Sequence, residues 1–214
     1  MKIGIIGQGN IGGSLGARWS ALGHDVVYGA RDPNSPKTRA ALADSGPDAR
    51  AVSLADAATF GQVVILAVPA AAVAETLDQL GDLNGKIVID TTNDLRHVRP
   101  EGTASLSQSI AERAPGARVI KTFNTMGWET IRDPRYGDES ATAFLCGDDA
   151  QAKATAMALI EQLGLEPIDV GPLAQAPRLD ELVLLFMAVA QNYGRNIAFR
   201  VLRRQSTSLG GPRF

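Results

Sequence analysis

Three glycines near the N-terminus have the spacing of a phosphate-binding turn. Gly7, Gly9 and Gly12 follow the first apolar run and open a helical pattern that starts at Ile11. In such a strand–turn–helix unit, the first glycine permits a tight turn, the second lets the backbone approach a pyrophosphate, and the third allows close helix packing. The free N–H groups and positive dipole at the helix start favour phosphate. The pattern predicts a dinucleotide site that includes Asn10 and Ile11; the alternative is a glycine-rich turn without a ligand.

The end of the next apolar run indicates which dinucleotide the turn would bind. An NAD site places an Asp or Glu about 20 residues beyond the glycines, at the carboxyl end of the second strand. Here this position holds Ala30 and Arg31, whereas Asp25 stands at the start of the strand. A guanidinium can stack on adenine and bond a 2′-phosphate, with Lys37 and Arg39 as further cations. The sequence therefore predicts NADP; the alternative is a solvated Arg31 and an Asp32 that binds the ribose of NAD.

Further candidate cofactor residues follow three later strands, at the points where those strands end. Ligands of open α/β sheets bind at the carboxyl ends of the strands, so we expect these residues on the nicotinamide side of the cofactor. Val68 and Pro69 would lie beside the nicotinamide ribose, and Thr92 and Asn93 would lie where the nicotinamide points. Asn124 and Thr125 could bond the carboxamide or the substrate. Phe123, Met126 and Trp128 are expected to flank a flat ring. For these loops the alternative is helix capping and packing.

The sequence contains no evident acid–base catalyst or nucleophile. It has neither a G-x-S-x-G elbow nor a Walker-type Gly-Lys-Ser/Thr sequence, so serine hydrolysis and nucleotide hydrolysis are unsupported. His97 is the one histidine in the expected loops, and Lys121 lies inside an apolar strand, which favours a buried stem over a general acid. Catalytic residues therefore stay unassigned. Such a site suits hydride transfer to a flavin-like ring, with two alternatives: a small carbonyl or imine reductase, and a non-catalytic NADP(H)-binding sensor.

The elements that must position these residues alternate along the chain. Apolar runs without polar alternation predict strands at residues 2–6, 25–28, 63–68, 86–90, 118–122, 142–146 and 166–170, with a weak strand near 51–52. Helical patterns lie between them at 11–22, 36–44, 70–80, 105–113 and 149–163. This order predicts an α/β fold with a doubly wound parallel sheet, a Rossmann-type NAD(P)-binding domain over residues 1–175.

The last part of the chain, residues 176–214, is expected to be a C-terminal helical segment. Residues 179–204 are predicted to form one long helix, apolar on every side at first and basic at its end. A helix that is apolar all round must be covered, either by a second copy of the chain or by its own sheet. We expect a homodimer and a contribution of this segment to the acceptor site.

Composition narrows the class of protein further. The 214 residues carry a net charge of −2, which gives no bulk attraction for nucleic acid or an anionic membrane. One cysteine and two histidines make an internal disulfide, a thiolate metal site or a histidine-rich metal site implausible. The longest apolar run, residues 182–190, is too short to span a bilayer, and the N-terminus does not resemble a targeting signal. We expect a soluble cytoplasmic protein without metal, with a small-molecule electron acceptor as its partner.

Essentially from end to end, the chain resembles the NADPH-dependent oxidoreductases of coenzyme F420, an 8-hydroxy-5-deazaflavin. The resemblance is carried by residues 2–12, 29–31, 119–125, 146–149, 164–173 and 194–199. It implies that NADP binds at the glycine turn and at Ala30 and Arg31. It also implies hydride transfer between NADPH and a planar co-substrate, coenzyme F420 or a flavin.

Overall fold

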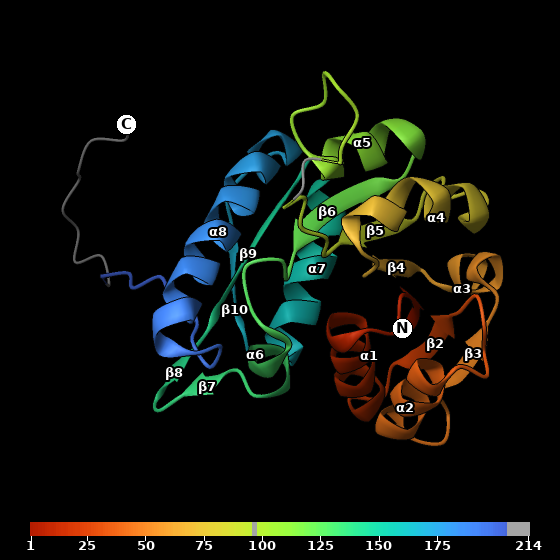
Figure 1. Ribbon diagram of the computed structural model, residues 1–214, viewed down its shortest axis with the longest axis horizontal. Coiled ribbons are helices and arrows are strands. Elements are labelled where there is room, and N and C mark those ends of the chain that lie inside the picture. Colours follow the sequence, from red (N-terminus) through yellow and green to blue (C-terminus); the bar gives the residue numbers. More distant parts are fainter. Residues whose placement is uncertain (96–97, 205–214) are drawn as a thin grey trace.

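The protein is built around one eight-stranded β-sheet with helices on both faces (Figure 1). The computed structural model describes residues 1–95 and 98–204. From edge to edge the sheet contains β10 (Glu166–Asp169), β9 (Thr142–Gly147), β6 (Arg118–Thr122), β5 (Ile87–Asp90), β4 (Val63–Leu66), β1 (Lys2–Ile6), β2 (Asp25–Gly29) and β3 (Arg50–Val52). A separate hairpin pairs β7 (Arg135–Tyr136) with β8 (Glu139–Ser140).

The helices divide between the two faces of the sheet because successive strand residues point to opposite sides. In β1, Ile3 and Ile5 join one apolar cluster and Ile6 joins the other. The first cluster is covered by α1 (Asn10–Ala21), α2 (Pro36–Ser45), α6 (Trp128–Arg132) and α7 (Ala150–Gln162). The second is covered by α3 (Leu54–Phe60), α4 (Val73–Leu80), α5 (Leu106–Arg113) and the start of α8 (Ala176–Tyr193), and short 3-10 turns precede α4 (Ala70–Ala72) and α8 (Leu173–Gln175).

Six strands confirm the predicted parallel sheet, in the order β3-β2-β1-β4-β5-β6. The last two strands differ from the prediction, because β9 runs antiparallel to β6, with Cys146 opposite Lys121, and β10 is parallel to β9. A parallel neighbour requires a crossover connection that carries the chain back to the end of the sheet where the previous strand began. Between β6 and β9 the only helix is α6, which has five residues, so the chain reverses direction and β9 starts near the end of β6.

The C-terminal helix is shorter than the sequence predicts. It covers Ala176–Tyr193, whereas residues 179–204 were expected to be helical throughout. Gly194 follows with φ 78°, a left-handed conformation that commonly ends helices at glycine. The chain then runs extended beside β9, where the Phe199 carbonyl accepts a hydrogen bond from the Thr142 N–H at 2.9 Å. The predicted helix was wrong beyond residue 193 because apolar and basic composition did not reveal this stop.

Helix α3 was not predicted, although a local signal for it exists. Its N-cap is Ser53, whose Oγ accepts a hydrogen bond from the Asp56 N–H at 3.1 Å. A serine followed three residues later by an acid is a helix-start pattern. The α6–β7–β8 segment was expected to be a loop, and its elements are too short to show a periodicity.

Helix α1 lies close to β2 because Gly16 has no side chain. A Cβ atom at Gly16 would lie 2.2 Å from Tyr28 Oη, which also hydrogen-bonds to Ser45 Oγ at 2.6 Å. At Gly13, one turn earlier, the nearest atoms to a Cβ would lie at 3.8 and 4.0 Å, which is ordinary van der Waals contact. Gly16 therefore has no room for a side chain, whereas Gly13 could accept a methyl group.

We predict that Gly16→Ala lowers the free energy of unfolding by about 1–3 kcal/mol, because the methyl group overpacks this contact. Gly13→Ala, the matched control, should instead raise it by up to about 1 kcal/mol, because alanine is the better helix former. Urea unfolding followed by circular dichroism measures both. Equal effects of the two substitutions would contradict the packing argument.

Candidate functional site

A groove of about 520 Å³ lies at the carboxyl ends of β1, β2 and β4. It brings together six of the residues predicted for the cofactor, from four separate parts of the chain: Gly7, Gly9, Arg31, Lys37, Val68 and Pro69. Gln8, Asp32, Ser35 and Thr76 also line it. The groove therefore lies where ligands of doubly wound sheets bind.

The glycine turn has the geometry that the spacing predicts. Gly7 has φ 103°, and a Cβ there would lie 2.4 Å from the Ala67 carbonyl oxygen. A Cβ at Gly12 would lie 1.9 Å from the Gly7 carbonyl oxygen, so the third glycine lets α1 start against the turn itself. Gly9 has no atom within 4 Å of its Cβ position and precedes α1 without a side-chain cap, which leaves the helix N-terminus open to an anion.

The remaining residues predicted for the turn differ in what they can contact. Asn10 is exposed and lines a neighbouring hollow between α1 and α2, next to the groove. Ile11 packs against the core, so only its backbone could contact a phosphate. Gln8, which the motif did not single out, donates from Nε2 to Thr38 Oγ1 at 2.7 Å and ties the turn to α2.

The wall formed by β2 and α2 carries the groove's positive charge. Arg31 and Lys37 are both exposed and line the groove, whereas Ala30 is buried and its N–H donates to the Val52 carbonyl at 3.0 Å. The backbone N–H of Ala30 is thus already used by the sheet. Asp32, the acid of the NAD alternative, accepts from the Asn34 N–H at 2.9 Å within the turn.

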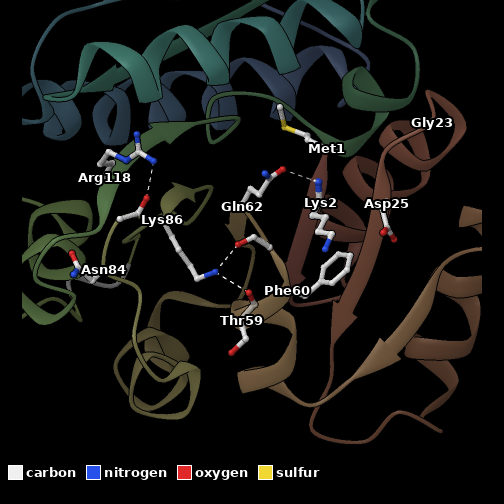
Figure 2. Close-up of a pocket in the computed structure, with 12 residues that line it drawn as sticks. Met1, Lys2, Gly23, Asp25, Thr59, Phe60, Gln62, Asn84, Lys86 and Arg118 are labelled. Atoms are coloured by element: carbon white, nitrogen blue, oxygen red, sulfur yellow. Dashed lines mark hydrogen bonds between the residues drawn. The ribbon is translucent and has the colours of Figure 1, made fainter.

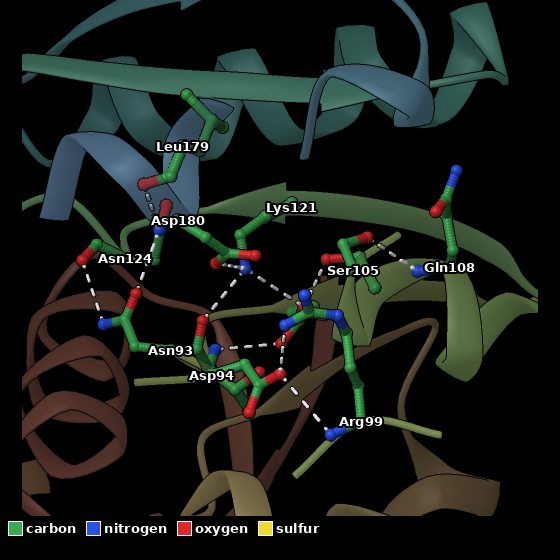
Figure 3. Close-up of polar contacts among 12 residues, drawn as sticks. Asn93, Asp94, Arg99, Ser105, Gln108, Lys121, Asn124, Leu179 and Asp180 are labelled. Atoms are coloured by element: carbon green, nitrogen blue, oxygen red, sulfur yellow. Dashed lines mark hydrogen bonds and ion pairs between the residues drawn. The ribbon is translucent and has the colours of Figure 1, made fainter. Parts of the chain in front are cut away.

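A second polar cluster lies under the ends of β5 and β6, at the start of α8 (Figure 3). Lys121 is completely buried, and its Nζ lies 3.5 Å from Asp90 Oδ2 and 3.0 Å from Asp180 Oδ1. It also donates to the Thr92 carbonyl at 2.9 Å. The expectation of a buried stem is confirmed, but the stem ends among carboxylates and not in water.

Burial and neighbouring charges both shift pKa values in this cluster. Desolvation alone would lower the pKa of Lys121, but the charges of Asp90 and Asp180 hold it above its ordinary value. Burial raises the pKa of Asp180, and the nearby Asp90 and Asp94 add to this effect against the attraction of Lys121. Asp180 thus combines partial exposure with a pKa above its ordinary value. No local pattern pointed to its role, because it lies 59 positions beyond Lys121 on another element.

Two asparagines join the polar loops to α8. Asn124 Nδ2 donates to Asn93 Oδ1 at 3.0 Å and to the Leu179 carbonyl at 3.0 Å, and Asn93 Nδ2 donates to the Asn124 carbonyl at 3.1 Å. Asn124, Thr92 and Thr125 are buried, and Asn93 is partly buried. The four residues predicted for the nicotinamide side therefore meet at adjacent strand ends, apart from the lining of the groove at the glycine turn.

Two buried oxygens in these loops fit a carboxamide ligand. Thr92 Oγ1 and Asn124 Oδ1 have no hydrogen-bond partner among the described residues. Buried polar atoms are normally satisfied, so an amide group that bonds them would remove a free-energy cost. Together with the open helix N-terminus at Gly9, these atoms fit a nicotinamide dinucleotide along this edge of the sheet.

Two of the three hydrophobic side chains expected to flank a ring, Phe123 and Met126, are instead buried in the core. Phe123 adopts φ 62°, which is rare for a residue with a side chain, and its ring packs edge-on against Trp19 with centroids 5.9 Å apart. Met126 is buried in the same cluster. Trp128 lies against the Arg132 guanidinium, 5.0 Å from its ring centroid. The turn at Phe123 directs that ring into the core while Asn124 reaches α8.

A larger hollow of about 770 Å³ lies at the opposite edge of the sheet (Figure 2). Its cations are already engaged: Lys86 Nζ donates to the carbonyls of Thr59 and Gly61 at 2.9 and 2.8 Å, and Arg118 donates to the Gly85 carbonyl at 2.7 Å. It lies at the amino ends of the parallel strands, away from the glycine turn. We therefore assign no cofactor to it.

Three further expectations concern His97, a metal site and a membrane-spanning helix. His97 lies outside the described residues. Among those that are described, no three His, Cys, Asp or Glu side chains gather in a way that could hold a metal ion. Within the same part of the chain, no helix has the length and apolar character needed to cross a membrane.

Comparison with known proteins identifies one matching family and several similar structures. The sequence model of the family described as "NADP oxidoreductase coenzyme F420-dependent" matches residues 2–94, from β1 to just beyond β5. The crystal structure of a candidate F420-dependent NADP reductase from Arthrobacter sp. FB24 is 30% identical, with a TM-score of 0.85, over 95% of this chain and 100% of that chain.

Similarity extends to other reductases. Metalloreductase STEAP3 of Rattus norvegicus is 30% identical over 86% of this chain, which spans only 36% of the length of that protein. A reductive aminase from Aspergillus terreus is 22% identical with a TM-score of 0.67, over 90% of this chain and 62% of that chain. The aminase shares the fold, and its identity is too low to carry function.

We predict that Lys121→Met lowers the free energy of unfolding by about 3–5 kcal/mol, because it leaves two carboxylates in the interior without their cation. The control is Lys153→Met, which removes a partly exposed pair to Asp169 at 2.8 Å and should cost at most about 1 kcal/mol. Chemical denaturation gives both values. A loss at Lys121 no greater than at Lys153 would show that the buried cluster is not needed for the fold.

Proposed function

Because this chain belongs to the family of coenzyme F420-dependent NADP oxidoreductases, we propose that it transfers hydride between NADPH and a planar acceptor, coenzyme F420 or a flavin. It is an NADPH-dependent oxidoreductase by family, and the identity and binding of the acceptor are the proposed part. The observation that carries the proposal is that cations line the groove at the glycine turn while, at the neighbouring strand ends, two buried oxygens beside the Asn93–Asn124 pair have no hydrogen-bond partner among the described residues.

In this proposal four groups of residues hold the cofactor, the last of them Thr92, Asn93, Asn124 and Thr125 on the nicotinamide side. The pyrophosphate binds the backbone at the start of α1, and Arg31 with Lys37 binds the 2′-phosphate beside Ala30. Val68 and Pro69 lie along the ribose of the nicotinamide half. The full set is Gly7, Gly9, Asn10, Ile11, Gly12, Ala30, Arg31, Lys37, Val68, Pro69, Thr92, Asn93, Asn124 and Thr125.

The protein's own contribution to the reaction is alignment. Once bound, the dinucleotide supplies a hydride from its nicotinamide. The Asn93–Asn124 hydrogen bonds fix the two polar loops against each other, and Lys121 fixes the Thr92 carbonyl from below. Rigid placement of two rings in reacting distance is by itself a large source of rate enhancement. Reduction of the planar acceptor also requires one proton, which water supplies in this proposal.

A second candidate function, reduction of a carbonyl or imine, is favoured by Asp180. Its carboxyl group lines a small cavity of about 140 Å³ between α8 and the segment after β5, next to Leu95, Arg99 and Leu184. The oxygen or nitrogen of such an acceptor must be protonated as hydride arrives, and Asp180 could deliver that proton. The Lys121 ammonium, 3.0 Å away, would then stabilise the carboxylate that remains.

We predict that NADPH binds more tightly than NADH, and that Arg31→Ala weakens NADPH by about 2 kcal/mol, roughly 30-fold in Kd, because charge-assisted bonds to the phosphate are lost. NADH, which has no 2′-phosphate, should bind nearly as before. The control is Arg39→Ala, at an exposed position of α2 outside the groove lining. Calorimetric titration measures each Kd; similar affinities of the wild-type protein for both dinucleotides would refute the cofactor assignment.

The acceptor is tested by NADPH oxidation with coenzyme F420, FMN, FAD, a ferric chelate, and simple carbonyls and imines. We expect the deazaflavin or a flavin to be reduced fastest, with kcat little changed in Asp180→Asn. If a carbonyl or imine is preferred, the rate should fall as pH rises through the raised pKa of Asp180, and Asp180→Asn should abolish that dependence. Flat rates with every acceptor would favour the NADP(H) sensor.

We also propose a cytoplasmic homodimer that closes through α8. The outer face of this helix exposes Leu184, Leu185 and Met187, of which the first two are more than half exposed. Contiguous apolar side chains on a surface helix are typical of an interface. We predict that Leu185→Glu yields a monomer in light scattering at micromolar concentration, with circular dichroism as the control for folding. A wild-type protein that is monomeric under the same conditions would exclude this dimer.

A further inference from the structure

The cation proposed to read the 2′-phosphate already has an anionic neighbour. Arg31 Nη2 lies 3.2 Å from Glu75 Oε2. Arg31 follows β2, and Glu75 is in the first turn of α4, so the pair joins two walls of the groove. Thr76, the next residue of α4, lines the same groove as Arg31.

This ion pair contributes little to the stability of the fold. The side chains of Arg31 and Glu75 are 55% and 64% exposed, and pairs in such positions are weakened by water and salt. Glu75 is also favourably placed at a helix start, and its Oε1 accepts from Gln79 Nε2 at 3.3 Å. Neither role requires that its carboxylate reach across to Arg31.

We propose that Glu75 is a specificity-determining residue, which competes with the 2′-phosphate for Arg31 and limits the preference for NADPH over NADH. The inference rests on the proposed role of Arg31 in cofactor binding. A phosphate that bonds Arg31 must displace the Glu75 carboxylate or lie beside it, and either costs free energy through lost pairing or like-charge repulsion. NADH presents only a hydroxyl at this position, so Glu75 has no comparable effect on it.

The test compares Glu75→Gln with Asp78→Asn, a matched control on the same helix. Asp78 pairs with Arg113 of α5 at 2.5 Å and does not line the groove, so its neutralisation removes an equal charge away from the cofactor. Calorimetric titration of NADPH and NADH gives Kd at low salt and again near 0.5 M salt. We expect Glu75→Gln to tighten NADPH about threefold to tenfold at low salt, and less at high salt where charges are screened. NADH, and both cofactors in Asp78→Asn, should stay within about twofold of the wild-type values.

A double-mutant cycle with Arg31→Ala separates this inference from the proposed function. If competition acts through Arg31, Glu75→Gln should have a smaller effect in the Arg31→Ala background. Unchanged or weaker NADPH binding in Glu75→Gln, with Arg31→Ala still harmful, would overturn the competition and leave the cofactor site intact. An Arg31→Ala protein that binds NADPH as tightly as wild type would instead overturn the proposed cofactor site itself.

Discussion

The buried ammonium group of Lys121 joins two central strands of the sheet to the C-terminal helix. Lys121 belongs to β6, and its carboxylate partners lie on β5 and α8. A buried charge is tolerated only when its partners are close and its hydrogen bonds are satisfied. Asp90 meets the same requirement by accepting from Ser107 of α5 at 2.6 Å and from the Thr92 N–H at 2.8 Å. Docking of α8 through Asp180 is therefore tied to the ends of the two central strands.

The consequences of this docking reach the candidate site. When α8 places Asp180 beside Lys121, the preceding residue, Leu179, presents its carbonyl to Asn124, and Asn124 in turn holds Asn93. The two loops on the nicotinamide side thus owe their positions to a helix that contributes no residue to the groove at the glycine turn. The family model, which matches residues 2–94, includes the first of these loops but neither Asn124 nor α8, while the Arthrobacter structure is similar over 95% of the chain.

Close packing imposes the other main constraint, at the opposite end of the same edge. Gly7, Gly12 and Gly16 each lack a side chain where a neighbouring atom leaves no space for one. These contacts bring α1 onto β1 and β2 and leave the N–H groups at its start facing the groove. Gly9 is free of such contacts, which is the condition for a ligand to approach the backbone there. The turn and the first part of α1 therefore contain three glycines packed against neighbouring protein atoms and one, Gly9, that a phosphate could approach.

The sequence by itself determined the features that depend on neighbouring residues. The glycine spacing, the apolar strands, and Arg31 at the end of β2 were enough to predict the six parallel strands and six of the residues that line the groove. Tertiary structure decided what depends on distant parts of the chain: the reversed direction of β9 and β10, the end of α8 at Tyr193, the partners of Lys121, and the contact of Arg31 with Glu75. The reason is physical, because periodicity and turn chemistry act over a few residues, whereas ion pairs form between side chains that only the folded chain brings within a few ångströms.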